Sequence, residues 1–208
     1  MVFMDKKILV VTPSIFTMGE GGGTQTVFET IKGYHRNGFD VTVLAITNKE
    51  NMDPFLYHGI RVEYFNIPLS MFKEKYDAFH SVFNYRMFHN SMLNSIAWRI
   101  FGILYAIYGI KRAINLVKQY DYDLIYCYTN ISIPIGSFIN RYFNILNVSR
   151  ILGIRFSYEK LSRFPNQILL FPDYLQYKWP CTLLIMTDDG TVGDKTALTN
   201  SIATSINI

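Results

Sequence analysis

Residues 7–12 read KILVVT, and residues 40–46 read DVTVLAI. Both are short apolar runs rich in β-branched residues, which is typical of strands that are buried on both faces of a parallel sheet. A glycine-rich segment stands between them, followed by Val27, Ile31 and Tyr34 at helical spacing. A strand, a helix and a second strand in this order indicate a βαβ unit. The sequence therefore predicts an α/β domain.

The same alternation of strand-like and helix-like patterns continues along the chain. We expect further strands over 60–67, 123–129, 148–156 and 182–186, and helices over 26–37, 94–119 and 134–143. Gly38 supplies the stop of the first helix. These elements predict one doubly wound parallel sheet, Rossmann-like, with strand order 3-2-1-4-5-6. We take residues 1–208 as a single domain, with an irregular aromatic insertion over 68–90.

The composition of the chain limits the classes of partner that it is expected to bind. The chain has 208 residues, 50% of them hydrophobic and 17% charged, with a formal net charge of +4, so it has ample material for a core. The basic residues are spread among apolar ones, whereas nucleic-acid binders concentrate them in a stripe. We therefore expect no nucleic-acid partner. An anionic membrane surface is the favoured polyanion, approached by the aromatic insertion and the long helix.

Three further features of the sequence bear on the location of the protein in the cell. Cys127 and Cys181 lie far apart in apolar surroundings, which predicts buried thiols in a reducing compartment. The N-terminal apolar run is too short for a signal peptide. The stretch 96–110 is interrupted by Arg99 and is shorter than the roughly 20 residues of a membrane span. We expect a cytoplasmic protein at the inner face of the membrane, without a transmembrane helix.

The glycine-rich segment after the first strand is the most informative local motif. Glycines between a strand and a helix let the backbone approach a phosphate at the helix N-terminus. Residues 19–24 read GEGGGT, which lacks the third glycine of the dinucleotide fingerprint, and the second strand ends without a ribose-binding acid. NAD is therefore disfavoured, and the absence of a following Lys-Ser or Lys-Thr excludes a P-loop. A turn without a ligand is the alternative.

Other chemistries have no support in the sequence. There is no GxSxG elbow, no HExxH and no cysteine–histidine cluster, so a serine hydrolase and a zinc enzyme are not indicated. Asp188 and Asp189 are adjacent, so they do not point into one cleft from a strand; an Asp-Gly turn that caps the next helix explains both. We expect no bound metal and no cofactor.

The order of these segments resembles the opening of the GT-B glycosyltransferases, of the subfamily-four-like type. The matching residues are the KILVVTP strand, the Gly22-Gly23 pair and the Gly38-Phe39-Asp40-Val41-Thr42-Val43 step. A second match is residues 183–191, which resemble that family's sixth strand and following turn. The resemblance covers nearly the whole chain and implies the N-terminal, acceptor-side domain of such an enzyme.

The resemblance implies roles for five residues. Gly22 and Gly23 would lend backbone N–H groups to the donor's diphosphate, while Thr24, Arg155 and Asp188 would line the cleft. Arg155 stands where the family often has a histidine and would meet a phosphate or an acidic acceptor; a surface arginine is the alternative. Catalytic residues are not assigned.

The implied reaction transfers a sugar from a nucleoside-diphosphate sugar to a hydroxyl, with a lipid-linked or polysaccharide acceptor. The cations that grip the donor belong to a C-terminal domain that we expect to be absent from residues 1–208, so the chain alone should be inactive and should tend to self-associate. The rival interpretation is a non-catalytic remnant, or a binding subunit that needs a separate donor-binding partner. A flavodoxin-like or response-regulator-like domain would require acids at the ends of the first two strands, which are missing.

Overall fold

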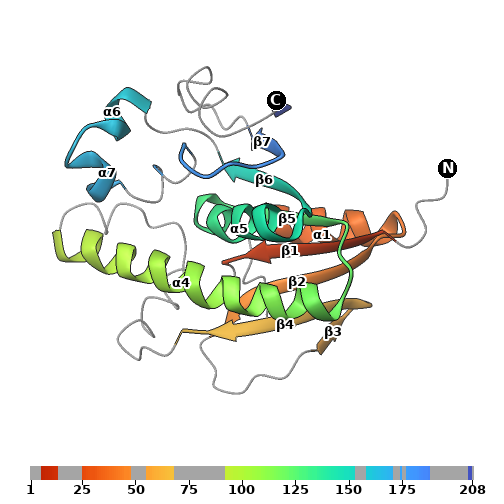
Figure 1. Ribbon diagram of the computed structural model, residues 1–208. Coiled ribbons are helices and arrows are strands. Elements are labelled where there is room, and N and C mark those ends of the chain that lie inside the picture. The colour runs from red at the N-terminus through yellow and green to blue at the C-terminus, as the bar shows by residue number, and fades with distance from the viewer. Residues whose placement is uncertain are drawn as a thin grey trace.

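The computed structural model describes residues 6–13, 25–47, 55–67, 92–152, 158–170, 174, 177–187 and 206–207. These residues form an eight-stranded sheet of order β3-β4-β2-β1-β5-β6-β7-β8 (Figure 1). All neighbouring strands are parallel except β3 and β4. The strands are β1 (Lys7–Thr12), β2 (Asp40–Thr47), β3 (Phe55–Tyr57), β4 (Ile60–Asn66), β5 (Leu124–Tyr128), β6 (Leu146–Leu152), β7 (Leu183–Thr187) and β8 (Ile206–Asn207).

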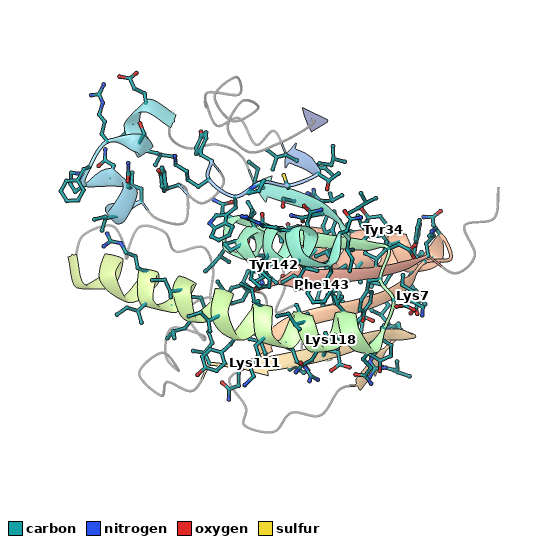
Figure 2. All side chains as sticks on the ribbon, viewed as in Figure 1. Lys7, Tyr34, Lys111, Lys118, Tyr142 and Phe143 are labelled. Carbon is teal, nitrogen blue, oxygen red and sulfur yellow. The ribbon has the colours of Figure 1, made fainter. Side chains whose placement is uncertain are left out.

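Helices cover both faces of this sheet, as a doubly wound fold requires. α1 (Gln25–Arg36) lies behind the sheet in Figure 1, and α4 (Met92–Gln119) and α5 (Ile133–Phe143) lie side by side in front of it. The short helices η2 (Asn130–Ser132), α6 (Tyr158–Ser162) and α7 (Asn166–Leu169) follow strand ends. Figure 2 shows Lys111 and Lys118 of α4 and Tyr142 and Phe143 of α5 on the same face of the molecule.

The predicted class and strand order are confirmed. The six strands expected from the sequence are β1, β2, β4, β5, β6 and β7, and they pair in the expected order. β6 begins at Leu146, two residues before the expected start at 148, and α1 begins at Gln25, ahead of the expected 26. β3 and β8 were not predicted, because three and two residues are too short to show an alternating pattern.

β1 is central because it bonds to β2 on one side and to β5 on the other. Its residues from Ile8 to Thr12 are all buried. Alternate side chains enter two apolar cores: Ile8 and Val10 pack toward α1, and Leu9 and Val11 pack toward α4 and α5. The continuous apolar run that suggested the fold is therefore explained by burial on both faces.

Helix ends are fixed by residues in the left-handed region. Gly38 has φ +85°, and the Phe39 amide donates to the Tyr34 carbonyl at 3.2 Å, which closes α1 as expected. Asn144, with φ 54°, closes α5 in the same way, and its amide donates to the Asn140 carbonyl at 3.0 Å. Asparagine tolerates this conformation better than most residues, so it serves here without a glycine.

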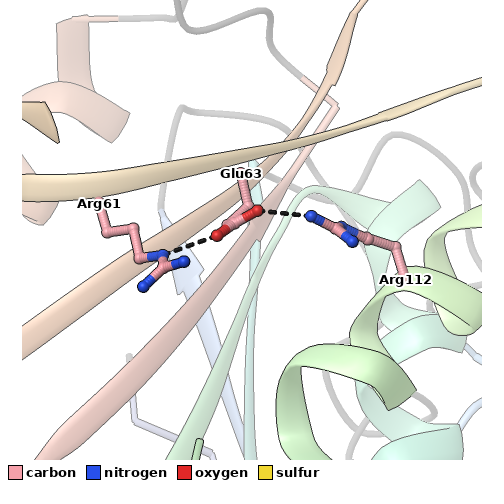
Figure 3. A network of polar contacts seen from close by, with 3 residues as sticks. All are labelled: Arg61, Glu63 and Arg112. Carbon is pink, nitrogen blue, oxygen red and sulfur yellow. Dashed lines mark hydrogen bonds and ion pairs between the residues drawn. The ribbon is translucent and has the colours of Figure 1, made fainter. Parts of the chain in front are cut away.

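A buried carboxylate fixes α4 on the sheet (Figure 3). Glu63 of β4 is 1% exposed, and its two oxygens accept hydrogen bonds from Arg61 Nε and from an Arg112 guanidinium nitrogen, each at 2.6 Å. Arg61 also lies 4.6 Å over the Tyr120 ring. A buried carboxylate without partners would be costly, so Arg112 ties the C-terminal half of α4 to β4, while Arg61 of β4 itself pairs with the second carboxylate oxygen.

α5 approaches the sheet so closely that Gly136 leaves no room for a side chain. A Cβ at this position would lie 2.3 Å from Cys127 Sγ and 2.5 Å from Asn147 Oδ1. Cys127 and Cys181 are both free and buried, as expected from the sequence. Burial raises the pKa of the Cys127 thiol, and it raises the pKa of Cys181 to about 11, so both thiols stay protonated and unreactive near neutral pH.

The close approach at Gly136 gives a test of the packing. We expect Gly136→Ala to destabilise the domain by about 1–3 kcal/mol, because α5 must move off β5 and β6 to make room. Gly33→Ala is the matched control in α1, where a Cβ meets nothing within 4 Å, and should stabilise the helix by about 0.5–1 kcal/mol. Thermal and urea unfolding of the two variants measure this, and equal midpoints would contradict the packing.

Candidate functional site

The carboxyl edge of the sheet is where the fold places a ligand site. The strands β1, β2, β4, β5, β6 and β7 are parallel, so their carboxyl ends share one edge. The chain leaves β1 for β2 on one side, while β5 lies on the other, so the direction of winding reverses between β1 and β5. In open α/β sheets, ligands bind at such a reversal.

All five predicted site residues lie outside the described residues. Gly22, Gly23 and Thr24 fall between Thr12, the last residue of β1, and Gln25, the first of α1. Arg155 comes three positions after the end of β6, and Asp188 directly follows β7. In sequence, each therefore belongs to a connection that leaves a carboxyl strand end. Their roles stay predictions, as does the use of the aromatic segment 68–90.

Thr129, at the carboxyl end of β5, is the most unusual described residue of this edge. It has φ 74° and ψ 158°, a conformation that is almost restricted to glycine. Its Oγ1 is buried without a hydrogen-bond partner, and its amide donates to the Arg150 carbonyl at 2.9 Å. Such strain concentrates at ligand sites, because the surrounding structure must hold it in place. Sequence reasoning missed this residue, since a threonine gives no signal of a positive φ.

Neither η2, which follows Thr129, nor α5, which follows η2, begins with a side-chain cap. Ser132 is the N-cap of α5 but makes no capping hydrogen bond, because its hydroxyl meets the Tyr105 hydroxyl at 3.1 Å. Burial raises the pKa of Tyr105, which keeps it a neutral hydrogen-bonding group. Neither α1 nor α5 has an acidic residue in its first turn. The positive dipole ends of both helices therefore meet no carboxylate from their own first turns.

Arg150 ties the first helix to the far strand of the site. It lies on β6, donates to Thr30 Oγ1 of α1 at 3.0 Å, and has its guanidinium carbon 5.7 Å from the centre of the Tyr128 ring. Burial raises the pKa of the neighbouring Tyr126 to about 12, so this tyrosine remains neutral. Arg155, and not Arg150, is the arginine that the sequence pattern predicts for the site. Arg150 alternates with buried residues of β6, and this pattern was the signal in the sequence for a partly buried cation.

The amino edge is closed by ordinary structural pairs. Asp123 accepts hydrogen bonds from Lys6 Nζ at 2.6 Å and from the Lys7 amide at 2.8 Å. These two bonds lower the pKa of the Asp123 carboxyl. The Asp40 amide donates to the Lys6 carbonyl at 3.0 Å. Because Lys6, Lys7 and Asp123 at the amino edge are already paired with one another, we assign the candidate site to the carboxyl edge. Among the residues that the structure describes, no group of three or more His, Cys, Asp or Glu side chains is arranged to hold a metal.

The strain at Thr129 makes a measurable prediction. Thr129→Gly should raise the free energy of unfolding by about 1 kcal/mol, because relief of the strained φ outweighs the added flexibility of glycine. Thr129→Ala removes the same unpartnered hydroxyl but keeps the strained φ, so the Gly variant should be more stable than the Ala variant as well. Chemical denaturation measures both. A Gly variant less stable than the wild-type chain would show that the conformation is not strained.

Comparisons with known proteins identify the fold and not a close relative. No family model matches the sequence, and no curated protein matches it. Solved structures do match. An E. coli trehalose-6-phosphate synthase structure with bound UDP-2-fluoro glucose has a TM-score of 0.53 at 15% identity, covering 94% of this chain and 42% of that one. Sucrose-phosphate synthase from Thermosynechococcus elongatus has a TM-score of 0.54 at 11% identity, with 97% and 47% covered.

A third similar structure is Arabidopsis thaliana UGT89C1 complexed with UDP, with a TM-score of 0.51 at 13% identity, covering 88% of this chain and 42% of that one. The chain thus spans less than half the length of these three structures. At such low identity the likeness concerns the fold alone. These neighbours are GT-B glycosyltransferases, and the chain shares their Rossmann-like α/β fold.

Proposed function

We propose that this chain is the acceptor-side half of a glycosyltransferase that moves a sugar from a nucleoside-diphosphate sugar to a hydroxyl. The observation that carries the proposal is the likeness in fold to glycosyltransferases over 88–97% of the chain. Fold alone does not determine function. The proposal therefore also relies on the carboxyl edge, where α5 starts without a side-chain cap and the glycine-rich connection follows the neighbouring strand β1.

The donor's diphosphate is the group that this edge is suited to bind. The Gly22-Gly23 turn leads into α1, whose first turn carries no acid to repel an anion. Backbone N–H groups at such a helix start stabilise the negative charge that grows on the leaving diphosphate. In the transfer, the acceptor hydroxyl attacks the anomeric carbon, the bond from that carbon to the diphosphate oxygen breaks, and the hydroxyl proton leaves. The base that takes this proton is not assigned.

Thr24, Arg155 and Asp188 are proposed to line the cleft around the acceptor. Each follows the carboxyl end of a different strand, β1, β6 or β7, within twelve residues. Arg155 would pair with a phosphate or carboxylate on the acceptor, since guanidinium groups bind both in a bidentate manner. Asp188 would accept from a sugar hydroxyl. The acceptor hydroxyl belongs to a lipid-linked sugar or to a polysaccharide.

A second domain is proposed to supply the cationic side of the donor site. Neutral amides bind a doubly charged diphosphate less strongly than charged donors, and charge-assisted hydrogen bonds are about twice as strong as neutral ones. The structures that this chain resembles are more than twice its length. We propose that the donor is held between this domain and such a partner, and that the 208 residues alone bind it weakly.

Calorimetric titration of the 208-residue chain with UDP-glucose, together with a product assay, tests whether the donor site needs a second domain. We expect a dissociation constant of about 1 mM or weaker, equivalent to roughly 4 kcal/mol, and no turnover above a blank. Micromolar affinity or measurable transfer would show that the complete site lies within these residues and that the proposed second half is unnecessary.

Residual nucleotide binding should depend on the glycine turn. In saturation-transfer NMR, UDP and UDP-glucose should give signals with the wild-type chain, and Gly22→Val with Gly23→Val should lose them, because side chains block backbone approach. Gly33→Ala is the control that leaves the turn intact. NAD and ATP should give weaker signals than UDP. Equal UDP signals from the wild-type chain and the double variant would reject the role of the two glycines in phosphate binding. If the wild-type chain gave no UDP signal at all, the result would favour a non-catalytic module.

A further inference from the structure

The outer surface of α4 carries a stripe that the fold does not cover. Ile100, Ile103 and Ile107 are 43%, 50% and 55% exposed, and their spacing of three and four residues places them on one side of the helix. Exposed Lys111 and Lys118 continue this side toward the C-terminal end (Figure 2). We call these five residues the outer stripe of α4.

The opposite side of α4 holds the helix in place. Phe101, Tyr105 and Leu116 are buried in the core between α4 and the sheet. Arg112 is bonded to buried Glu63. The segment Arg99–Gln119 has the length and hydropathy of a membrane span, a test that a helix covering a sheet also passes. Because the inner side of α4 packs in the core, α4 cannot separate from the domain. The outer stripe is therefore part of the surface of the domain.

The charge of α4 is entirely of one sign. Its sequence from Met92 to Gln119 contains no Asp or Glu, and its basic residues are Arg99, Lys111, Arg112 and Lys118. The acid that α4 does meet, Glu63, is buried beneath it and offers nothing to solvent. The outer stripe is thus apolar over its first half and positive over its second, within a chain of net charge +4. An apolar, positively charged surface complements an anionic lipid bilayer.

α5 extends this surface beside α4. Tyr142 is 65% exposed, and Arg141 next to it is also exposed. Figure 2 shows Tyr142 on the same face as Lys111 and Lys118. Tyrosine has an apolar ring and a polar hydroxyl, which suits it to the boundary between lipid tails and headgroups.

A second copy of the chain fits the outer stripe less well than lipid does. Two stripes packed face to face would bring four lysines together, with no acidic residue of either α4 to neutralise them. Lysine side chains at a bilayer instead lay their aliphatic stems along the apolar region and keep their ammonium groups among headgroup phosphates.

We propose that the outer stripe of α4 binds the surface of anionic phospholipid membranes, with the three isoleucines entering the interface and the two lysines meeting headgroup phosphates. The three isoleucines lie nearer the N-terminal end of α4 than the two lysines do, and that end lies toward the carboxyl edge of the sheet (Figure 1). Binding would therefore bring that edge close to the membrane. This inference concerns the surface alone and holds whether or not the chain takes part in sugar transfer.

Vesicle co-sedimentation tests the proposal, with phosphatidylcholine vesicles and with vesicles that contain about one-third phosphatidylglycerol. We expect the wild-type chain to pellet only with the anionic vesicles, and to return to the supernatant at about 0.5 M salt because the lysine contacts are screened. Equal recovery in the supernatant with both lipids at low salt would overturn the proposal. Resistance of the bound chain to alkaline carbonate would also overturn it, because that behaviour belongs to a spanning helix.

Matched variants locate the surface. Ile103→Ser with Ile107→Ser should weaken partitioning by about tenfold or more. Leu146→Ser should leave it within about twofold, because Leu146 is equally exposed, at 56%, but lies on the same face of β6 as Val148, which is the face that α1 covers. Lys111→Glu should weaken partitioning by about tenfold, while Arg36→Glu at the end of α1 makes the same change in charge with little effect.

Far-ultraviolet circular dichroism and thermal unfolding check that each variant is folded before it is compared. Equal losses in the stripe variants and their controls would overturn the proposal, because the effect would then be one of net charge or general hydrophobicity. Sedimentation without vesicles completes the set. Pelleting of the wild type that Ile103→Ser with Ile107→Ser abolishes would assign the stripe to self-association instead.

Discussion

The burial of β1 on both faces is the constraint on which the rest of the structure depends. Its backbone groups are paired with β2 on one side and β5 on the other, and its side chains enter two separate cores. A strand of this kind must have a helical layer on each face, because its apolar residues point both ways. α1 supplies one layer, and α4 and α5 supply the other. The reversal of winding that creates the candidate site is a consequence of the same strand.

The parts of the fold that local patterns could predict are those in which burial repeats along the chain. The apolar runs of β1 and β2, the proline near the start of α5 and Gly38 after α1 all gave correct elements, and their alternation gave the strand order. Long-range contacts gave no such signal. No pattern near Glu63 in the sequence predicts its contact with Arg112, which is 49 residues away. The positive φ of Thr129 occurs at the junction that leads from β5 to η2 and α5, and no residue type there indicates it. β3 and β8 were too short to show a period.

The residues around the candidate site also differ in whether a local sequence pattern could predict them. The site residues that the sequence predicts stand in connections after β1, β6 and β7, because glycines, an arginine and an aspartate stand out after apolar strands, and their roles stay predictions. It missed Thr129, Ser132 and Arg150, whose importance lies in strain, a displaced cap and a bond to α1. Their contacts join β5 to β6, η2 to α4 and β6 to α1.

The central claim is that nucleotide meets the carboxyl edge at the reversal between β1 and β5. Mapping the amide chemical-shift changes of ¹⁵N-labelled chain on addition of UDP tests this most directly. The account predicts changes clustered at Thr12, Thr129 and Asn130 and at the glycines 22 and 23. Changes that instead cluster at Lys6, Asp40 and Asp123, on the opposite edge of the sheet, would contradict it.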